Sequence, residues 1–403
     1  MKILITTEWY DPAVNGVVVS VDNLKKGLEE LGHEVRVLTV SSSWRSVNKE
    51  NVTYIGSVNA GRIYPGARVA IPTPRISRHI DSLIRWRPDI IHSQSEFSTF
   101  YMARSIAADG RVPIVHTYHT VYEDYTHYFI PSKRLGRTVV SRLSRQILAR
   151  TACVIVPTEK VRTRLLGYGV TADIEVIPTG LDPGSAPGAL SGEDKLAFRQ
   201  RWGIPDQNKV LVAVGRLAKE KSLEEILLYL SRLSRPDMTL LVVGDGPNKE
   251  ALQTYAGHLG IADQVIFTGM VKHSEVAAFY QVGDVFVNAS RSETQGLSTL
   301  EALANGVPLL CRKDSSWDAV IREGVNGWQY ETLEDFEEKL DGLLQREGPF
   351  RLMPNDADKD LTDHSYKEFA RKVEAVYLKY VGRSLEKEVP LWLLQRSAPW
   401  QLR

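Results

Sequence analysis

Short apolar runs alternate with amphipathic stretches along most of the chain. In the first half, the apolar runs predict buried strands over residues 2–6, 33–40, 90–92, 113–116 and 153–157. In the second half, a similar series predicts strands over residues 209–214, 238–243, 264–268, 285–287 and 308–311. Helical spacing fills the intervals, as over residues 17–31, which Gly32 follows as a helix stop. This alternation predicts an α/β protein with two doubly wound, Rossmann-like domains.

A stretch dense in Gly, Pro and Ser separates the two series of strands and indicates a domain boundary. We expect a first domain over residues 1–183, a linker over residues 184–207 and a second domain over residues 208–383. The tail, residues 384–403, is apolar for a chain end, and we expect it to pack back on the first domain. Because doubly wound sheets bind ligands beyond the carboxyl ends of their strands, the predicted active site is a cleft across which the two domains face each other.

The composition narrows the class of protein. The chain has 403 residues, a formal net charge of +1 and 43% hydrophobic residues, enough for two cores of ordinary size. Cys153 and Cys311 both lie in apolar runs typical of buried strands, which does not suggest a disulfide framework. No apolar run approaches the roughly 18 residues of a spanning helix, and the first apolar run is too short for a signal peptide. We therefore expect a cytoplasmic protein.

Two glutamates flank a glycine after the predicted strand 285–287. Glu293 lies in the strand-to-helix loop, and Glu301 lies on the first turns of the helix that follows. Gly296 between them lets the backbone approach a ligand closely, and the amides of a helix start attract phosphate. This arrangement suits a sugar nucleotide, with Glu293 on the sugar hydroxyls and Glu301 on the ribose. The alternative is a pair of carboxylates that only decorate a helix start, where the helix dipole favours them.

A second charged loop follows the predicted strand 209–214 and contains Arg216 and Lys221. Ser222 and Glu225 have the spacing of a capping box, which predicts a helix start at residue 223. The two cations would then stand at the carboxyl edge of the sheet, where they suit a pyrophosphate leaving group. The alternative is a solvated charged loop.

Glycine turns follow two other predicted strands. Gly16 opens the first long helix, after a loop that lacks the Gly-x-Gly-x-x-Gly fingerprint of nicotinamide and flavin oxidoreductases. Gly16 is therefore either a point where a diphosphate meets the backbone or an ordinary turn. The turn 243–246 also contains two glycines and is compatible with a purely structural role.

A stretch rich in histidine and tyrosine, residues 116–128, follows the predicted strand 113–116. Its position at a strand end predicts a wall for polyhydroxylated or anionic ligands. A zinc site built on His116, His119 and His127 is the competing explanation, but the three match no recognisable metal-binding motif.

A basic amphipathic stretch covers residues 132–150, in the half of the chain that carries an excess of basic residues. Helical spacing predicts a single apolar face formed by Leu135, Val139, Val140, Leu143 and Ile147. Arg134, Arg137 and Arg145 fall on the other face. Such a helix either lies on an anionic bilayer or packs as an ordinary helix with a solvated face.

Together these motifs resemble the retaining glycosyltransferases of family 4, which have the GT-B fold, over nearly the whole chain. The resemblance is carried by the Glu-x7-Glu element at 293–301, the Gly-Arg-x4-Lys element at 215–221 and the sequence Ile-Pro-Thr-Gly-Leu-Asp at 177–182. Thr179 is a departure, because many members have Asn there. Segments 8–12, 15–17, 116–125 and 292–297 look like bacterial 1,2-diacylglycerol 3-alpha-glucosyltransferases, which make monoglucosyl lipids from UDP-glucose.

The resemblance implies a role for each candidate residue. The implied donor contacts are Arg216, Lys221, Gly16, Gly296 and Leu297 for the diphosphate, Glu301 for the ribose, Val271 for the base and Glu293 for the sugar. His119 matches the family's active-site histidine beside the donor sugar. The implied catalytic set is therefore His119, Glu293, Arg216 and Lys221. The family needs no metal and no cofactor other than the donor substrate.

The resemblance also implies the reaction, a transfer of a hexose such as glucose from a UDP-sugar to a diacylglycerol-type lipid. The expected partners are the UDP-sugar, the lipid acceptor and an anionic membrane surface, with no nucleic acid. The enzyme would be peripheral on the inner face of the cell membrane and would act by positioning and electrostatic stabilisation. Two alternatives stay open, a family 4 enzyme with a soluble glycan or phosphatidylinositol as acceptor and a GT-B sugar-nucleotide epimerase. The basic helix and the aromatic stretch favour a transferase, since an epimerase needs no acceptor groove.

Overall fold

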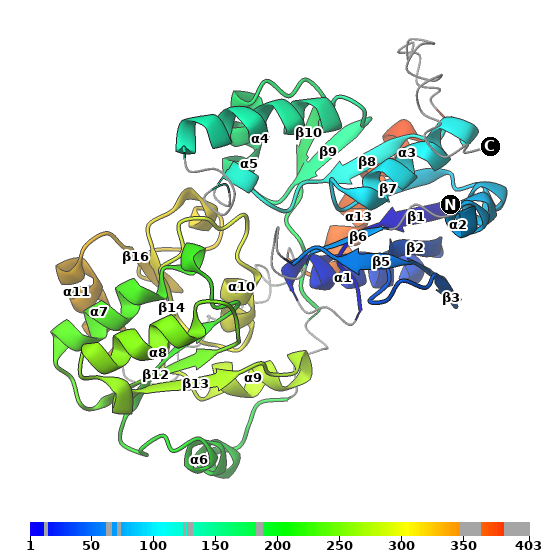
Figure 1. The fold of residues 1–403 in the computed structure, drawn as a ribbon. Coiled ribbons are helices and arrows are strands. Elements are labelled where there is room, and N and C mark those ends of the chain that lie inside the picture. The colour runs from blue at the N-terminus through cyan, green and yellow to red at the C-terminus, as the bar shows by residue number, and fades with distance from the viewer. Residues whose placement is uncertain are drawn as a thin grey trace. The chain divides into compact units, whose positions relative to one another are not determined.

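The computed structural model describes residues 1–11, 15–61, 67–70, 74–123, 126, 132–182, 188–345 and 364–382. They form two compact units, one made of Met1–Gly180 with the C-terminal helix from Tyr366, and the other of Leu181–Ser365. In each unit helices flank a mainly parallel sheet, as Figure 1 shows. The predicted α/β fold with two doubly wound sheets is therefore confirmed.

The first unit is built on one large sheet and a small antiparallel pair. The sheet contains β1 (Lys2–Thr6), β2 (Glu34–Val40), β3 (Val47–Lys49), β4 (Val52–Ile55), β7 (Ile90–Ser93), β8 (Ile114–Thr117), β9 (Cys153–Val156) and β10 (Asp173–Val176). Their order is β10-β9-β8-β7-β1-β2-β4-β3, parallel except where β3 meets β4. The small pair is β5 (Ser57–Asn59) with β6 (Arg68–Ala70). Strands β7, β8 and β9 are buried throughout, which explains their continuous apolar sequence.

The described helices of the first unit cover both faces of its sheet. They are α1 (Gly16–Glu30), α2 (Pro74–Trp86), α3 (Ser98–Gly110), α4 (Lys133–Leu148), α5 (Glu159–Gly167) and α13 (Tyr366–Tyr380). Among the described residues of the chain, no helix has both the length and the apolar character needed to cross a bilayer.

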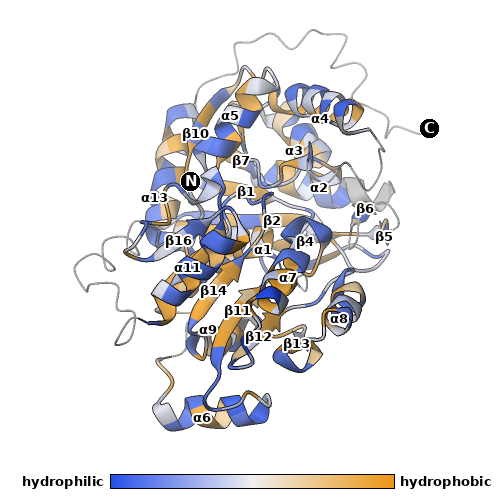
Figure 2. Cartoon of the chain, turned by 90° about the vertical axis from the view of Figure 1, so that its left-hand side faces the viewer, coloured by the Kyte–Doolittle hydropathy of each residue, from blue (hydrophilic) through white to orange (hydrophobic). Residues whose placement is uncertain are grey.

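The second unit is a fully parallel sheet of six strands. The strands are β11 (Lys209–Val214), β12 (Met238–Val243), β13 (Val265–Gly269), β14 (Val285–Asn288), β15 (Leu309–Arg312) and β16 (Gly327–Tyr330), in the order β13-β12-β11-β14-β15-β16. The helices are α6 (Gly192–Arg201), α7 (Leu223–Leu233), α8 (Lys249–His258), α9 (His273–Gln281), α10 (Leu297–Ala304) and α11 (Leu333–Leu344), with short 3-10 turns η3 (Lys219–Lys221), η4 (Ala262–Gln264) and η5 (Ser315–Trp317). Figure 2 shows that β11, β12 and β14 are strongly hydrophobic, as strands covered on both faces should be.

The C-terminal helix belongs to a different unit from the one expected. Helix α13 packs along α1, and its residues Val373 and Tyr377 are buried in the same core as Ile3. Gly27 permits this close approach, because a Cβ there would lie 2.5 Å from the Cβ of Ala370. The second domain therefore ends at Ser365 and not at residue 383. An amphipathic pattern shows that a helix covers a sheet, but it does not show which of two sheets.

The expected linker, residues 184–207, is also corrected. The second unit starts at Leu181, and the interval contains α6, which a capping box at Ser191 and Asp194 begins. The tail, residues 384–403, lies outside the described residues.

Candidate functional site

A pocket lies at the carboxyl ends of β11 and β14 in the second unit. Its lining includes Gly215, Arg216, Lys221, Asn288 and Glu293. Three of the predicted site residues, Arg216, Lys221 and Glu293, therefore meet at one place, although they lie on two separate strand-to-helix loops. The shared position of strand ends in a parallel sheet explains this meeting.

The pocket holds a direct ion pair between two of these residues. Lys221 Nζ lies 2.5 Å from Glu293 Oε1. The Glu293 side chain is 8% exposed and that of Lys221 is 30% exposed, so water screens the pair only in part. The cation expected to meet a diphosphate is thus in contact with the carboxylate expected to meet a sugar.

The loop that carries Lys221 does not contain the predicted capping box. Ser222, the residue that directly follows η3, has a left-handed backbone conformation with φ of 51°. The Ser222 side chain makes no capping hydrogen bond, and Glu225 instead forms an ion pair with Arg312 at 2.9 Å. An N-cap side chain reaches the helix amides from an extended backbone, which Ser222 lacks. The predicted helix start at Leu223 is nevertheless confirmed.

The glycine turn after β12 packs against the backbone of the loop that carries Arg216. The Leu217 amide donates to the Asp245 carbonyl at 3.0 Å. A Cβ at Gly246 would lie 2.3 Å from the Leu217 carbonyl oxygen, and a Cβ at Gly244 would lie 2.1 Å from that of Gly215. Only glycine fits under this backbone, so the turn has a structural role in holding the Arg216 loop.

The loop that carries Glu293 is held by residues that sequence analysis missed. Ser316 Oγ donates to the Glu293 carbonyl oxygen at 2.7 Å. Gly296 has φ of 74°, and a Cβ there would lie 2.5 Å from the buried ring of Trp317. Ser316 and Trp317 belong to η5, which follows β15 at the same edge of the sheet, so their position after a strand is the signal that could have identified them. Leu297 then begins α10.

Glu301 and Val271 occupy other parts of the second unit. Glu301 Oε2 accepts a hydrogen bond from the buried Tyr280 hydroxyl at 2.9 Å, and Val271 is partly buried after β13. Within the described part of this unit, the pocket around Lys221 is lined by neither residue. Their assignment to ribose and base stays a prediction.

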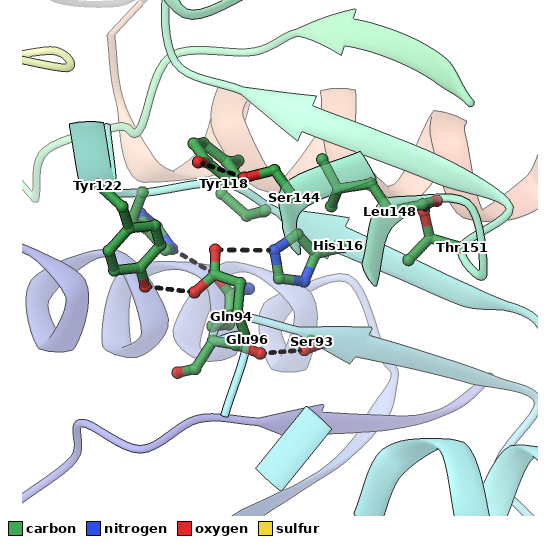
Figure 3. Close-up of polar contacts among 12 residues, drawn as sticks. Ser93, Gln94, Glu96, His116, Tyr118, Tyr122, Ser144, Leu148 and Thr151 are labelled. Atoms are coloured by element: carbon green, nitrogen blue, oxygen red, sulfur yellow. Dashed lines mark hydrogen bonds and ion pairs between the residues drawn. The ribbon is translucent and has the colours of Figure 1, made fainter. Parts of the chain in front are cut away.

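The first unit has its own cluster of buried polar side chains, at the carboxyl ends of β7 and β8 (Figure 3). His116 Nε2 lies 3.2 Å from Glu96 Oε1, and the Tyr122 hydroxyl donates to the other carboxylate oxygen. Figure 3 shows His116 and Tyr122 approaching Glu96 from opposite sides. Burial raises the pKa of Tyr122 well above its usual value, so this phenol keeps its proton and acts as a donor.

His119 pairs with a glutamine that sequence analysis did not single out. Its Nε2 lies 2.6 Å from Gln94 Oε1. Burial, with His116 nearby, lowers the pKa of His119 to about 3, so the ring is neutral at physiological pH. An amide oxygen only accepts, so Nε2 carries the proton and Nδ1 has the free lone pair. His127, the third histidine of the stretch, lies outside the described residues.

Gly16 begins α1, as predicted, but a side chain already occupies part of this helix start. Asn15 Oδ1 accepts hydrogen bonds from the amides of Val17 at 2.9 Å and Val18 at 3.1 Å. A phosphate would have to share or displace this cap. The diphosphate role of Gly16 stays a prediction.

Comparison with known proteins gives two family matches along the chain. Residues 14–185 match the family described as Glycosyltransferase Family 4, and residues 194–360 match the family described as Glycosyl transferases group 1. The alpha-monoglucosyldiacylglycerol synthase of Acholeplasma laidlawii is 30% identical over 96% of this chain and 99% of that protein. The alpha-monoglucosyldiacylglycerol synthase of Streptococcus pneumoniae is 33% identical over 82% of this chain and 75% of that protein.

The fold is similar to that of solved glycosyltransferase structures. Anabaena Alr3699/HepE, crystallised with UDP and glucose, superposes with a TM-score of 0.74 at 16% identity, over 94% of this chain and 100% of that chain. This similarity concerns the fold, and the sequence matches above concern the family. The chain belongs to the family 4 and group 1 glycosyltransferases and has the GT-B fold.

Proposed function

We propose that this glycosyltransferase moves glucose from UDP-glucose to a diacylglycerol-type lipid at an anionic membrane surface, with retention of the anomeric configuration. The observation that carries the donor half is the pocket in which Arg216, Lys221 and Glu293 meet. The names of the two synthases support glucose and a diacylglycerol acceptor. The UDP and glucose held by the solved structure support the donor.

The Lys221–Glu293 pair suggests how the donor enters. A UDP-sugar would separate the pair, with Lys221 turning to the diphosphate and Glu293 to the sugar hydroxyls. Arg216 would meet the same diphosphate through its forked donors, and the Gly296–Leu297 backbone and Gly16 would add amide contacts. Glu301 would hold the ribose and Val271 would contact the base. No step in this scheme requires a metal ion.

The chemical step would take place on one face of the sugar. The bond from the anomeric carbon to the diphosphate oxygen breaks, the bond to the acceptor oxygen forms, and the acceptor proton passes to the leaving phosphate. His119 would accept a hydrogen bond from a donor-sugar hydroxyl through Nδ1. Lys221 and Arg216 would stabilise the charge that grows on the leaving group.

The pH dependence tests the state of His119. Because the pKa of His119 is lowered to about 3, the ring should not titrate in the range where an ordinary histidine does, around pH 6.5. We expect kcat/KM to show no loss from imidazole protonation between about pH 5 and pH 8. Gln94→Glu should raise the pKa of His119, because a carboxylate against Nε2 favours the imidazolium. The loss of kcat/KM at acid pH should then begin at a higher pH than in the wild type. Gln94→Met is the control, since it adds no charge; an unchanged pH dependence in Gln94→Glu would contradict the assignment.

The exposed side chains of helix α4 support the proposed contact with a lipid surface. They also show that the predicted single apolar face of this helix was wrong. Val140 and Ile147 are 8% and 6% exposed and pack on the core. Leu135, Val139 and Leu143 are 57%, 46% and 45% exposed and form an outward stripe, here called the α4 stripe. The five residues span an arc of the helix that is too wide to face the core as a whole. One side of the arc is therefore buried and the other side is exposed. An exposed apolar stripe among arginines is typical of a helix that lies on anionic lipid.

The α4 stripe gives a direct test of membrane contact. Replacing Leu135, Val139 and Leu143 with Ser should weaken sedimentation with phosphatidylglycerol vesicles about tenfold or more, because the apolar contact with lipid is lost. The melting temperature should change little, since these side chains are already exposed.

The matched control removes three exposed leucines from other helices of the chain. These are Leu166, Leu196 and Leu378, which are 55%, 48% and 63% exposed. Their replacement with Ser should leave vesicle binding intact. Equal losses in the two triple variants would remove α4 from the interface.

The experiment that tests the function is a transfer assay with UDP- and GDP-sugars, with and without diacylglycerol in phosphatidylglycerol vesicles. The expected result is a monoglucosyl lipid from UDP-glucose, with the α-anomer identified by NMR. Transfer to soluble glycan or to phosphatidylinositol in preference to diacylglycerol would replace the acceptor. Interconversion of the UDP-sugar without any acceptor would indicate an epimerase.

A further inference from the structure

A groove runs between α3 and α4 on the first unit. Apolar, amide and guanidinium groups line it, contributed by Phe100, Tyr101, Arg104, Leu143, Gln146, Ile147 and Arg150. Tyr101 is 57% exposed and Leu143 belongs to the α4 stripe. The groove is therefore open to the same side as the proposed lipid contact.

Two arginines lie among the described residues that line this groove, and none of those residues is acidic. Within the described residues, neither Arg104 nor Arg150 has an ion pair or side-chain hydrogen bond. Burial, followed by the charge of Arg150, lowers the pKa of Arg104. Arg104 is partly buried and Arg150 is exposed. The usual arrangement of a partly buried guanidinium such as that of Arg104 is a carboxylate partner, as Arg164 has with Glu123 at 2.9 Å. Two cations that repel each other in one groove are stabilised by an anion between them.

The surroundings of the two arginines indicate which anion fits. Leu143 continues along α4 into Val139 and Leu135, so the groove is bordered by exposed apolar side chains. Phe97, which directly precedes α3, is also exposed, and its ring packs edge-on against that of Tyr122 with 5.8 Å between the ring centroids. An amphiphile with an anionic head would contact both the arginines and the exposed apolar side chains, whereas a small inorganic anion would contact the arginines alone.

We propose that the Arg104–Arg150 groove binds the phosphate of an anionic phospholipid headgroup, with the acyl chains lying along the α4 stripe. This site rests on the proposed action at a lipid surface, and it is separate from the donor pocket in the second unit. Its occupant would be a membrane lipid that is neither donor nor acceptor. Occupancy would hold the first unit on the bilayer in one orientation.

The test compares two double variants that remove the same charge. Arg104→Gln with Arg150→Gln removes the groove cations, and Arg134→Gln with Arg142→Gln removes two exposed cations of α4 outside the groove. Binding to vesicles is measured with phosphatidylcholine alone and with added phosphatidylglycerol, together with melting temperature. We expect each removed surface cation to weaken binding to the anionic vesicles about fivefold, and the groove variant to lose a further tenfold.

A monomeric short-chain phosphatidylglycerol separates a specific site from diffuse charge. The wild type and the Arg134–Arg142 variant should bind it with the same affinity, whereas the Arg104–Arg150 variant should not bind it. Equal behaviour of the two variants in both assays would overturn the proposal. Competition by inorganic phosphate at the same concentration would also overturn it, because the site would then recognise a free anion and not a lipid.

UDP binding is measured on the same samples. It should be unchanged in both variants, because none of the four arginines lies in the second unit. If the wild-type protein did not bind UDP, the proposed donor would be rejected, but the result on headgroup binding would still stand.

Discussion

Glu293→Gln should lower the rate of glycosyl transfer about a hundredfold while leaving affinity for UDP at or above the wild-type value. The amide keeps the shape of the side chain but removes the charge that lies 2.5 Å from Lys221. Lys221 is then released toward the diphosphate, whereas the sugar loses a strong acceptor at the reacting centre. Transfer rates at saturating donor, together with calorimetric titration of UDP, measure the two effects separately.

Glu301→Ala is the comparison for this variant. If Glu301 holds the ribose, its removal should weaken UDP binding. The buried Tyr280 hydroxyl also loses the partner that now lies at 2.9 Å, which should cost about 1–3 kcal/mol of stability and lower the melting temperature. Equal loss of UDP affinity in Glu293→Gln and Glu301→Ala would contradict the division of roles between the two carboxylates.

Lys221→Ala should reduce kcat more than it weakens donor binding. The charge that Lys221 meets grows as the diphosphate leaves, so its contribution is largest in the transition state. A loss of about a hundredfold to a thousandfold in kcat is expected, as for other preorganised groups that stabilise a developing negative charge. A raised KM for the donor with an unchanged kcat would show that Lys221 only binds the ground state.

The double variant Lys221→Ala with Glu293→Gln checks whether the two residues act through their ion pair. Lys221→Ala alone leaves the Glu293 carboxylate, which is 8% exposed, without this cation. Neutralising Glu293 as well should recover stability but not transfer. If the losses of activation free energy from the two single variants add up in the double variant, the two residues act independently.

The central strands could be predicted from sequence because burial on both faces makes them continuous apolar runs. The bounds of β1, β11 and β12 agree with the expectation residue by residue. The two edge strands of the first sheet were missed for the opposite reason: β3 is exposed along its whole length and β10 has no fully buried residue, so neither has an apolar run. Such strands are defined by their neighbours and not by their own residues.

Some residues of the candidate site could likewise be predicted from sequence, and others could not. Arg216, Lys221 and Glu293 could be placed together because each follows a strand of one parallel sheet. Gln94 and Ser316 could not be assigned a role, because each acts through a contact with a residue distant in sequence, His119 and Glu293 respectively. The predicted capping box at Ser222 was wrong because the tight turn before this residue sets its backbone conformation, even though its spacing to Glu225 fits the motif.

The position of α13 makes the first unit discontinuous in sequence. A ribosome delivers residues 1–180, then the whole second unit, and only then the helix that lies over α1. Until that moment Leu24 and Leu28, which are fully buried in the finished molecule, lack the covering provided by Val373 and Tyr377. The first unit therefore completes its fold last, although it is synthesised first, and its nascent form presents an apolar strip to chaperones. An isolated fragment 1–180 should aggregate, and a separately supplied peptide 364–382 should rescue it by complementation.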